Sequence, residues 1–250
     1  MKITDGIYIV ASLQLGISGH WDSHVYLVKG SDGLVLIDAG GGTAGEVILE
    51  NIRQEGFEPQ DIKALLLTHN HFDHSCGAAE FREKTGCKVH LSWRTKDLLE
   101  HGTAEEAGLD GAKERGVYPT DFQYRNCAVD KAVYDGDVIE AAGLEFEAIA
   151  VEGHSPDSIC YLVETGGKRN LFCGDVLFYG GIVGLINAPG STMDGYRQDL
   201  KKLAGLEIDG LFPGHMLFTV TGGQRHIDAA IEQCNKGMIP QTIGQYGIIF

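Results

Sequence analysis

The chain has 250 residues, of which 43% are apolar, and its 20 Lys plus Arg and 35 Asp plus Glu leave a formal net charge of −15. A chain of this size can bury a sizeable core, so we expect one α/β domain over residues 1–250. The acidic balance and the lack of a basic block argue against nucleic acid as a partner. No apolar run approaches the roughly 18 residues of a membrane span, so we expect no membrane association.

The N-terminus and the cysteines bear on the cellular compartment. The segment MKITDGIYIVASLQLG is interrupted by Asp5 and Gly6, unlike the apolar core of a secretory signal. The six cysteines lie at positions 76, 87, 127, 160, 173 and 234. They form no CxxC pair, and most of them fall in apolar segments. They are interpreted as reduced core thiols, and the predicted location is the cytoplasm.

The first 66 residues alternate between strand and helix patterns. GIYIVAS, HVYLVKG and LVLIDAG predict three strands separated by turns. Residues 43–55 carry Val47, Ile48 and Ile52 on one face and stop before Gly56, which predicts a helix with a glycine cap. The short continuous run IKALLL predicts a strand that is buried on both faces.

The rest of the chain repeats this order. A helix over 74–85 and a strand at CKVHLS precede residues 94–126, a more polar stretch that predicts a helical or irregular insertion able to serve as a lid. Strands are then predicted at KAVYDGD, LEFEAIAV, ICYLVE and NLFCGD, and helices at about 193–203 and 223–236 flank a short strand in LFPGH. This order predicts two packed sheets with helices outside.

One predicted core strand ends in a dense group of titratable residues. In DIKALLLTHNHFDH, residues 61–74, the apolar run is followed by His69, His71, Asp73 and His74. Residues two apart diverge by about 200° on a helix but can aim at one point from an extended loop, so a loop is predicted here. Four such groups repel or desolvate one another unless a cation neutralises them, which indicates a metal site.

Three further residues of metal-ligating type share this setting. His154 in AVEGHSPDS, Asp175 in LFCGDVLF and His215 in LFPGHMLF each follow an apolar strand and lie beside a glycine. The glycine lets the backbone turn sharply, so the side chain can face a cleft. Ligands at several strand ends can converge on one face of a sheet.

At these residues the chain resembles the metallo-β-lactamase fold superfamily, whose motif HxHxDH stands here as HNHFDH. The resemblance runs from Asp38 in LVLIDAG through His154, Asp175 and His215 in the expected order. Residues 174–206 are similar to the segment that runs from the bridging aspartate into a helix in glyoxalase II-like hydrolases, and the chain as a whole resembles glyoxalase II-like and lactonase-like members. The resemblance implies an αββα sandwich of two mixed sheets flanked by helices, with two divalent metal ions.

The resemblance also implies a set of ligands. One metal would take His69, His71 and His154, the other Asp73, His74 and His215, and Asp175 would bridge them. Asp38 would hold the ligand loop by hydrogen bonds, although an aspartate there also suits a simple turn before glycines. Zinc suits imidazole and carboxylate ligands best, and iron or manganese would also be accepted.

The expected activity is hydrolysis of a small ester-like substrate, a thioester or a lactone. The redox-active diiron branch of the family generally has glutamate where this chain has His71, which favours hydrolysis. A metal-bridging hydroxide would attack the carbonyl, and Asp73 would orient it and pass its proton to the leaving group. Residues His20, Trp21, His24 and Tyr179 are predicted to line the substrate pocket.

Two other functions stay open. A two-metal clamp also stabilises a phosphoryl transition state, so a small phosphodiester is an alternative substrate. A metal-binding protein without catalysis is the second alternative. The apolar C-terminus IGQYGIIF would pack either on its own domain or on a second subunit in a homodimer.

Overall fold

The computed structural model describes residues 1–19, 21–116, 118–237 and 240–246. Contacts divide the chain into two compact units. Among the described residues, unit 1 contains Met1–Val133 and Ala141–Gly143, and unit 2 contains Tyr134–Glu140 and the residues from Leu144 to Tyr246. Each unit has its own large sheet, and the single-domain organisation stays a prediction.

Unit 1 is built on a six-stranded mixed sheet. Its strands follow chain order: β1 (Ile7–Ala11), β2 (Val25–Lys29), β3 (Leu34–Ile37), β4 (Ile62–Leu66), β5 (Lys88–Ser92) and β6 (Lys131–Val133). The first three pair antiparallel, and β3 to β6 pair parallel. The carboxyl ends of β3 and β4 therefore lie at one edge of the sheet, where Asp38 and the histidine motif follow them.

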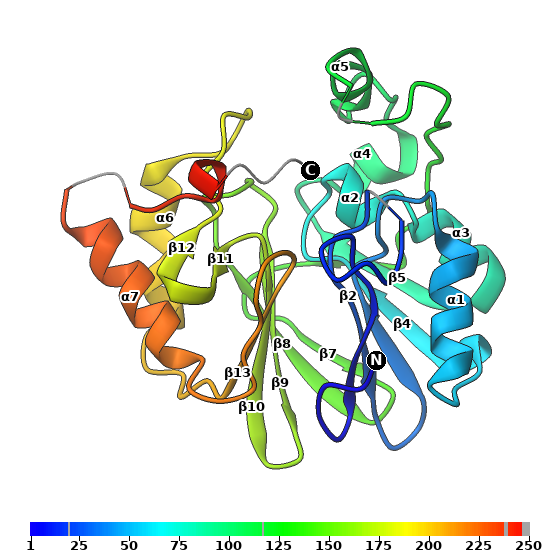
Figure 1. Cartoon of the computed structure of the whole chain (residues 1–250), viewed down its shortest axis with the longest axis horizontal. Helices are drawn as coiled ribbons and strands as arrows, with labels where there is room; N and C mark the ends of the chain where they lie inside the picture. Colours follow the sequence, from blue (N-terminus) through cyan, green and yellow to red (C-terminus); the bar gives the residue numbers. More distant parts are fainter. Residues whose placement is uncertain (20, 117, 238–239, 247–250) are drawn as a thin grey trace. The chain divides into compact units, whose positions relative to one another are not determined.

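Helices α1 (Gly45–Gln54) and α3 (Ala78–Thr85) lie beside this sheet (Figure 1). The predicted apolar face of α1 is only partly buried: Ile48 and Ile52 join the core with Phe81 of α3, whereas Val47 is exposed. The predicted glycine stop is confirmed, since Gly56 has a φ of 85° just beyond the helix. A 3-10 turn, Pro59–Asp61, leads into β4.

The segment 94–126 contains two short helices joined by irregular chain. Helix α4 (Lys96–His101) follows β5, and α5 (Leu109–Glu114) lies farther along (Figure 1). The described residues are thus helical or irregular as predicted, and the status of the segment as an insertion stays a prediction. Leu109, Ala112 and Tyr118 are buried and form a small apolar core of their own. Its role as a lid stays a prediction.

His90 on β5 should make unit 1 sensitive to acid. The side chain is 8% exposed, and its Nδ1 has no hydrogen-bond partner among the described residues. Burial, reinforced by Lys131, lowers the pKa of His90 to about 4. Because this pKa lies below the usual value of a histidine, the stabilising effect of the neutral ring is complete above about pH 6.5 and is lost as pH falls toward 4.

We expect the metal-free protein to lose on the order of 2–3 kcal/mol of its free energy of unfolding through His90 between pH 7 and 4.5. Urea unfolding with a chelator present, at both pH values, measures this loss. The variant His90→Leu should lose less stability than the wild type between these two pH values. The matched control His101→Leu changes an exposed histidine and should lose as much stability as the wild type. Equal losses in wild type and His90→Leu would contradict the prediction.

Unit 2 contains a five-stranded mixed sheet and a small ribbon. The sheet has the order β13 (Gly210–Pro213), β10 (Lys168–Gly174), β9 (Ile159–Thr165), β8 (Leu144–Ala150) and β7 (Val138–Ala141). Strands β8, β9 and β10 pair antiparallel, and β10 pairs parallel with β13. Strands β11 (Leu177–Phe178) and β12 (Ile182–Val183) form the ribbon around a 3-10 turn, Tyr179–Gly181.

Helices α6 (Met193–Asp199) and α7 (Gln224–Asn235) complete unit 2 and lie near each other in Figure 1. The Thr192 side chain caps α6 by accepting from the Gly195 N–H at 3.1 Å. The helix predicted over 193–203 is split, because Leu200–Leu203 continues as a 3-10 helix. A last 3-10 turn spans Ile243–Tyr246, and the rest of the C-terminal segment IGQYGIIF, residues 247–250, lies outside the described residues.

The cysteine prediction is confirmed, since all six are buried and none forms a disulfide. Burial raises the pKa of the Cys76 thiol to about 12 and that of Cys127 to about 11, so both stay protonated near neutral pH. Across the described part of the chain, no helix is both long enough and apolar enough to span a bilayer.

Candidate metal centre

The histidine motif occupies a turn after β4, called here the ligand turn (residues 68–77). His69 and His71 lie in irregular chain, as predicted, but Asp73 and His74 lie in a short helix, α2 (Phe72–Ser75). The prediction of loop geometry is therefore wrong for Asp73, and the helix predicted from residue 74 begins earlier, at Phe72. The His71 carbonyl accepts from the N–H groups of His74 at 3.1 Å and Ser75 at 3.0 Å, which closes a helical turn.

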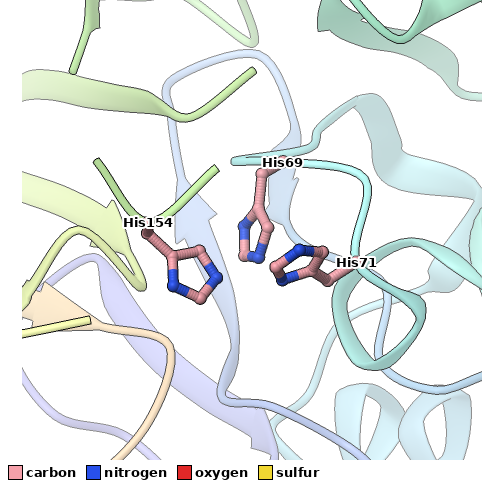
Figure 2. A group of neighbouring side chains, drawn as sticks. All are labelled: His69, His71 and His154. Carbon is pink, nitrogen blue, oxygen red and sulfur yellow. The ribbon is translucent and has the colours of Figure 1, made fainter. Parts of the chain in front are cut away.

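The four motif side chains lie close together. The ring of His69 is 4.5 Å from the ring of His71 and 4.2 Å from the ring of His74, measured between centroids. His74 Nε2 lies 3.5 Å from an Asp73 carboxylate oxygen. Figure 2 shows His69 and His71 leaving the same stretch of chain with their rings directed toward each other. Unit 1 thus presents three imidazoles and one carboxylate at one place.

Asp38 and Thr68 determine which ring nitrogens face outward. Asp38 Oδ1 accepts from the Thr68 N–H at 2.7 Å, and its Oδ2 accepts from His74 Nδ1 at 2.8 Å. The Thr68 hydroxyl donates to the same carboxylate at 2.9 Å and can therefore accept from His69 Nδ1 at 3.1 Å. With Nδ1 protonated in both rings, Nε2 carries the lone pair that binds a metal.

The backbone of Asp38 is itself unusual. Its φ of 63° is left-handed, a conformation that aspartate tolerates better than most residues. Its N–H donates to the Leu66 carbonyl at 3.0 Å, and the next N–H, of Ala39, donates to the His74 carbonyl at 2.7 Å. The sequence left Asp38 open between a turn residue and a hydrogen-bonding partner of the ligand loop, and in the structure it has both properties.

Unit 2 brings together its own three predicted ligands. His154 Nε2 lies 3.7 Å and His215 Nε2 lies 3.5 Å from the same oxygen of Asp175. All three residues are buried. His154, drawn on its loop in Figure 2, donates from Nδ1 to the Gly184 carbonyl at 2.6 Å, so its Nε2 is again the nitrogen left for a metal.

Thr68 and Gly184 were missed by sequence reasoning. Thr68 has a weak local signal, a hydroxyl directly between a buried strand and the first histidine. Gly184 has none. A Cβ on Gly184 would lie 1.7 Å from the Asp175 carbonyl oxygen and 3.0 Å from His154 Nδ1, so only glycine allows this approach.

The four residues predicted to line a substrate pocket have different surroundings. His20 lies outside the described residues. Trp21 is partly buried, with its ring 5.7 Å from that of Tyr118. His24 is 1% exposed and packs edge-on against Tyr26.

Tyr179, the fourth candidate, is 38% exposed in unit 2, and its ring lies 4.2 Å from that of His226. Its neighbour Phe178 is fully buried. Contact of these residues with a substrate stays a prediction.

The donor set of each unit fits a divalent metal ion. Buried imidazoles with one nitrogen tied to a protein acceptor, together with buried carboxylates, are the ligands that zinc and its neighbours prefer. The ligand atoms of His69 and His71, of His69 and His74, and of Asp73 and His74 lie within 4.8 Å of one another. The two ligand atoms of each pair are near enough to bind the same metal ion.

Comparison with known proteins shows the family. The model of the metallo-beta-lactamase superfamily matches residues 18–215, which include all seven predicted ligands. The chain belongs to the metallo-beta-lactamase superfamily. The predicted family is confirmed, and with it the assignment as a metal-dependent hydrolase.

Relatives and solved structures agree with this assignment. The chain is 30% identical over 164 residues to "Probable metallo-hydrolase YqgX" of Bacillus subtilis, covering 66% of this chain and 70% of the relative. It is 29% identical over 190 residues to the hydroxyacylglutathione hydrolase of Citrobacter koseri, covering 76% of this chain and 60% of that protein's length.

The structural comparison identifies the fold. BJP-1, a subclass B3 metallo-beta-lactamase of Bradyrhizobium japonicum, matches with a TM-score of 0.68 and 25% identity, over 93% of this chain and 89% of its own. A metallo-beta-lactamase of Cronobacter sakazakii matches with a TM-score of 0.70 and 19% identity, over 92% and 93%. The predicted α/β fold with two mixed sheets flanked by helices is confirmed.

Proposed function

We propose that the chain is a binuclear hydrolase of a small ester-like carbonyl substrate, a thioester or a lactone. The observation that carries the proposal is the shared arrangement of the ring nitrogens: His69, His74 and His154 each bind a protein acceptor through Nδ1. With Nδ1 used in this way, Nε2 is the nitrogen of each ring that would bind a metal, the usual arrangement of histidine ligands.

In this proposal, one metal would be held by His69, His71 and His154 and the other by Asp73, His74 and His215, and Asp175 would be a ligand of both. Zinc is the proposed ion, and iron or manganese would suit the same nitrogen and oxygen donors. When bound, two such ions supply a Lewis acid for the carbonyl and lower the pKa of water from about 15.7 toward neutrality.

Asp73 is the proposed catalytic carboxylate. It is 6% exposed, and its main-chain carbonyl accepts from the Ser23 N–H at 3.2 Å, which restrains the start of α2. A carboxylate held in this way can orient the attacking water by accepting its hydrogen bond, and can carry a proton to the leaving sulfur or oxygen.

The carbonyl substrate class is supported by the relatives. One has hydroxyacylglutathione hydrolase as its name, and the structural matches are named as beta-lactamases, so both names denote hydrolysis at a carbonyl. The formal charge of −15 disfavours a polyanionic phosphodiester such as a nucleic acid. A small-molecule substrate is proposed, and a cytoplasmic location and a homodimer stay predictions.

The test is proton release, followed with a pH indicator, from protein loaded with zinc, manganese or iron. The substrates are thioesters, lactones, β-lactams and small phosphodiesters, and the metal content of each sample is measured in parallel. Turnover of thioesters or lactones with about two metals per chain is expected. Turnover of phosphodiesters alone, or metal binding without any turnover, would replace the proposal with one of the two alternatives.

A further inference from the structure

One side chain of the segment 94–126, Tyr118, packs against the ligand turn. Tyr118 is 2% exposed and lies at the centre of an aromatic group. Its ring centroid is 4.9 Å from that of Phe72, 5.0 Å from Phe122 and 5.7 Å from Trp21. Phe72 follows His71 and precedes Asp73, so this packing acts directly on the ligand turn.

The Tyr118 hydroxyl makes a second connection, to the glycine turn (residues 38–42) that follows β3. It donates to the Gly41 carbonyl, and the Gly41 N–H donates to Asp22 at 2.9 Å. A Cβ on Gly41 would lie 2.7 Å from this hydroxyl and 2.3 Å from the Trp21 carbonyl oxygen. Gly41 is therefore held on both sides, and no other residue would fit there.

The glycine turn is in turn bonded to the ligand turn. The Gly40 carbonyl accepts from the Gly77 N–H at 3.2 Å, and the Ala39 N–H donates to the His74 carbonyl at 2.7 Å. Asp38, at the start of the same glycine turn, binds the His74 ring at 2.8 Å. A displacement of Gly41 would thus pass to the ring and the backbone of His74.

We propose that Tyr118 is a positioning residue that couples the packing of the insertion to metal binding by the ligand turn. It holds Phe72 by ring contact and the glycine turn by its hydroxyl, and both connections end on residues adjacent to the proposed ligands. By linkage, metal binding stabilises the insertion as much as the packed insertion favours metal binding. The inference rests on the proposed metal binding by His69, His71, Asp73 and His74.

The first test compares Tyr118→Phe with Tyr124→Phe. Both variants remove one hydroxyl and keep the ring in the same aromatic group, but Tyr124 donates to the Leu98 carbonyl at 3.4 Å, within the insertion segment itself. Zinc affinity is measured by competition with a chelator, and ligand geometry from the visible absorption of cobalt-loaded protein.

Tyr118→Phe should bind zinc about tenfold more weakly than the wild type, which is the lower end of the range of losses for residues that orient metal ligands. Its cobalt spectrum should also differ from that of the wild type. Tyr124→Phe should match the wild type in both. Phe122→Leu, which keeps the Tyr118 hydroxyl but loosens its ring, should show a smaller loss in the same direction and serves if Tyr118→Phe does not fold.

The second test measures the reverse effect. Backbone hydrogen exchange in α5 should slow when zinc is added to the wild type, and this slowing should be reduced in Tyr118→Phe. If the wild type binds zinc and Tyr118→Phe has the same zinc affinity, cobalt spectrum and exchange behaviour as the wild type, the coupling is wrong but the proposed function stands. A wild type that binds no metal would overturn the proposed function as well.

Discussion

Replacing His71 by alanine is expected to lower turnover by at least about a hundredfold while the fold persists. His71 ends the irregular part of the ligand turn, just before α2, and its side chain is only partly buried. Its ring contacts His69, 4.5 Å away between centroids. The ring is therefore expected to serve as a metal ligand more than as core packing, and its loss should cost metal binding before it costs stability.

The measurement is kcat/KM together with metal content per chain, and circular dichroism reports the fold. The matched control is His101→Ala, because the side chain of His101 is 80% exposed at the end of α4. Turnover near the wild-type value in His71→Ala, with the control unaffected, would show that the site has been assigned to the wrong residues.

Replacing Asp38 by asparagine is expected to weaken metal binding about 10- to 100-fold. Asparagine keeps the size of the side chain and tolerates the left-handed φ of 63°. It has only one acceptor oxygen, however, whereas Asp38 accepts from the Thr68 N–H and hydroxyl and from His74 Nδ1. One of these donors loses its partner, and the orientation of a ligand ring is no longer fixed.

Chelator competition measures this loss, and thermal unfolding of the metal-free protein separates it from a general loss of stability. Asp5→Asn is the control, since Asp5 is an exposed carboxylate that pairs with Lys2 at 2.6 Å. Metal affinity of Asp38→Asn equal to that of the wild type would mean that the carboxylate does not orient His74 in solution.

The sequence was informative where the signal is local. The apolar runs IYIVA and IKALL predict strands because a strand needs only a few adjacent residues that favour extended chain and burial, and both lie in strands of the unit 1 sheet. The HNHFDH motif was equally clear, because several titratable residues directly after a core strand are unfavourable unless they bind a cation. Its family followed from the motif and the order of the later ligands.

Local reasoning failed where neighbours in sequence allow more than one conformation. Asp73 was expected in a loop, yet the His71 carbonyl accepts two backbone N–H groups and Asp73 lies in the short helix α2. The helix predicted over 193–203 changes to a 3-10 helix at Leu200 for a similar reason, since α and 3-10 turns differ by one residue in their hydrogen bonds.

By itself, the sequence determined most of the strands, the burial of the cysteines, the kinds of side chain at the candidate metal centre and the family, because each depends on residue identity and short spacing. Only the tertiary structure decided which ring nitrogens face outward and what holds the ligand turn in place. Asp38 meets Thr68 across 30 residues, and Tyr118 meets Gly41 across 77. Such contacts depend on how strands and turns fold back on one another, and no periodicity in the chain encodes them.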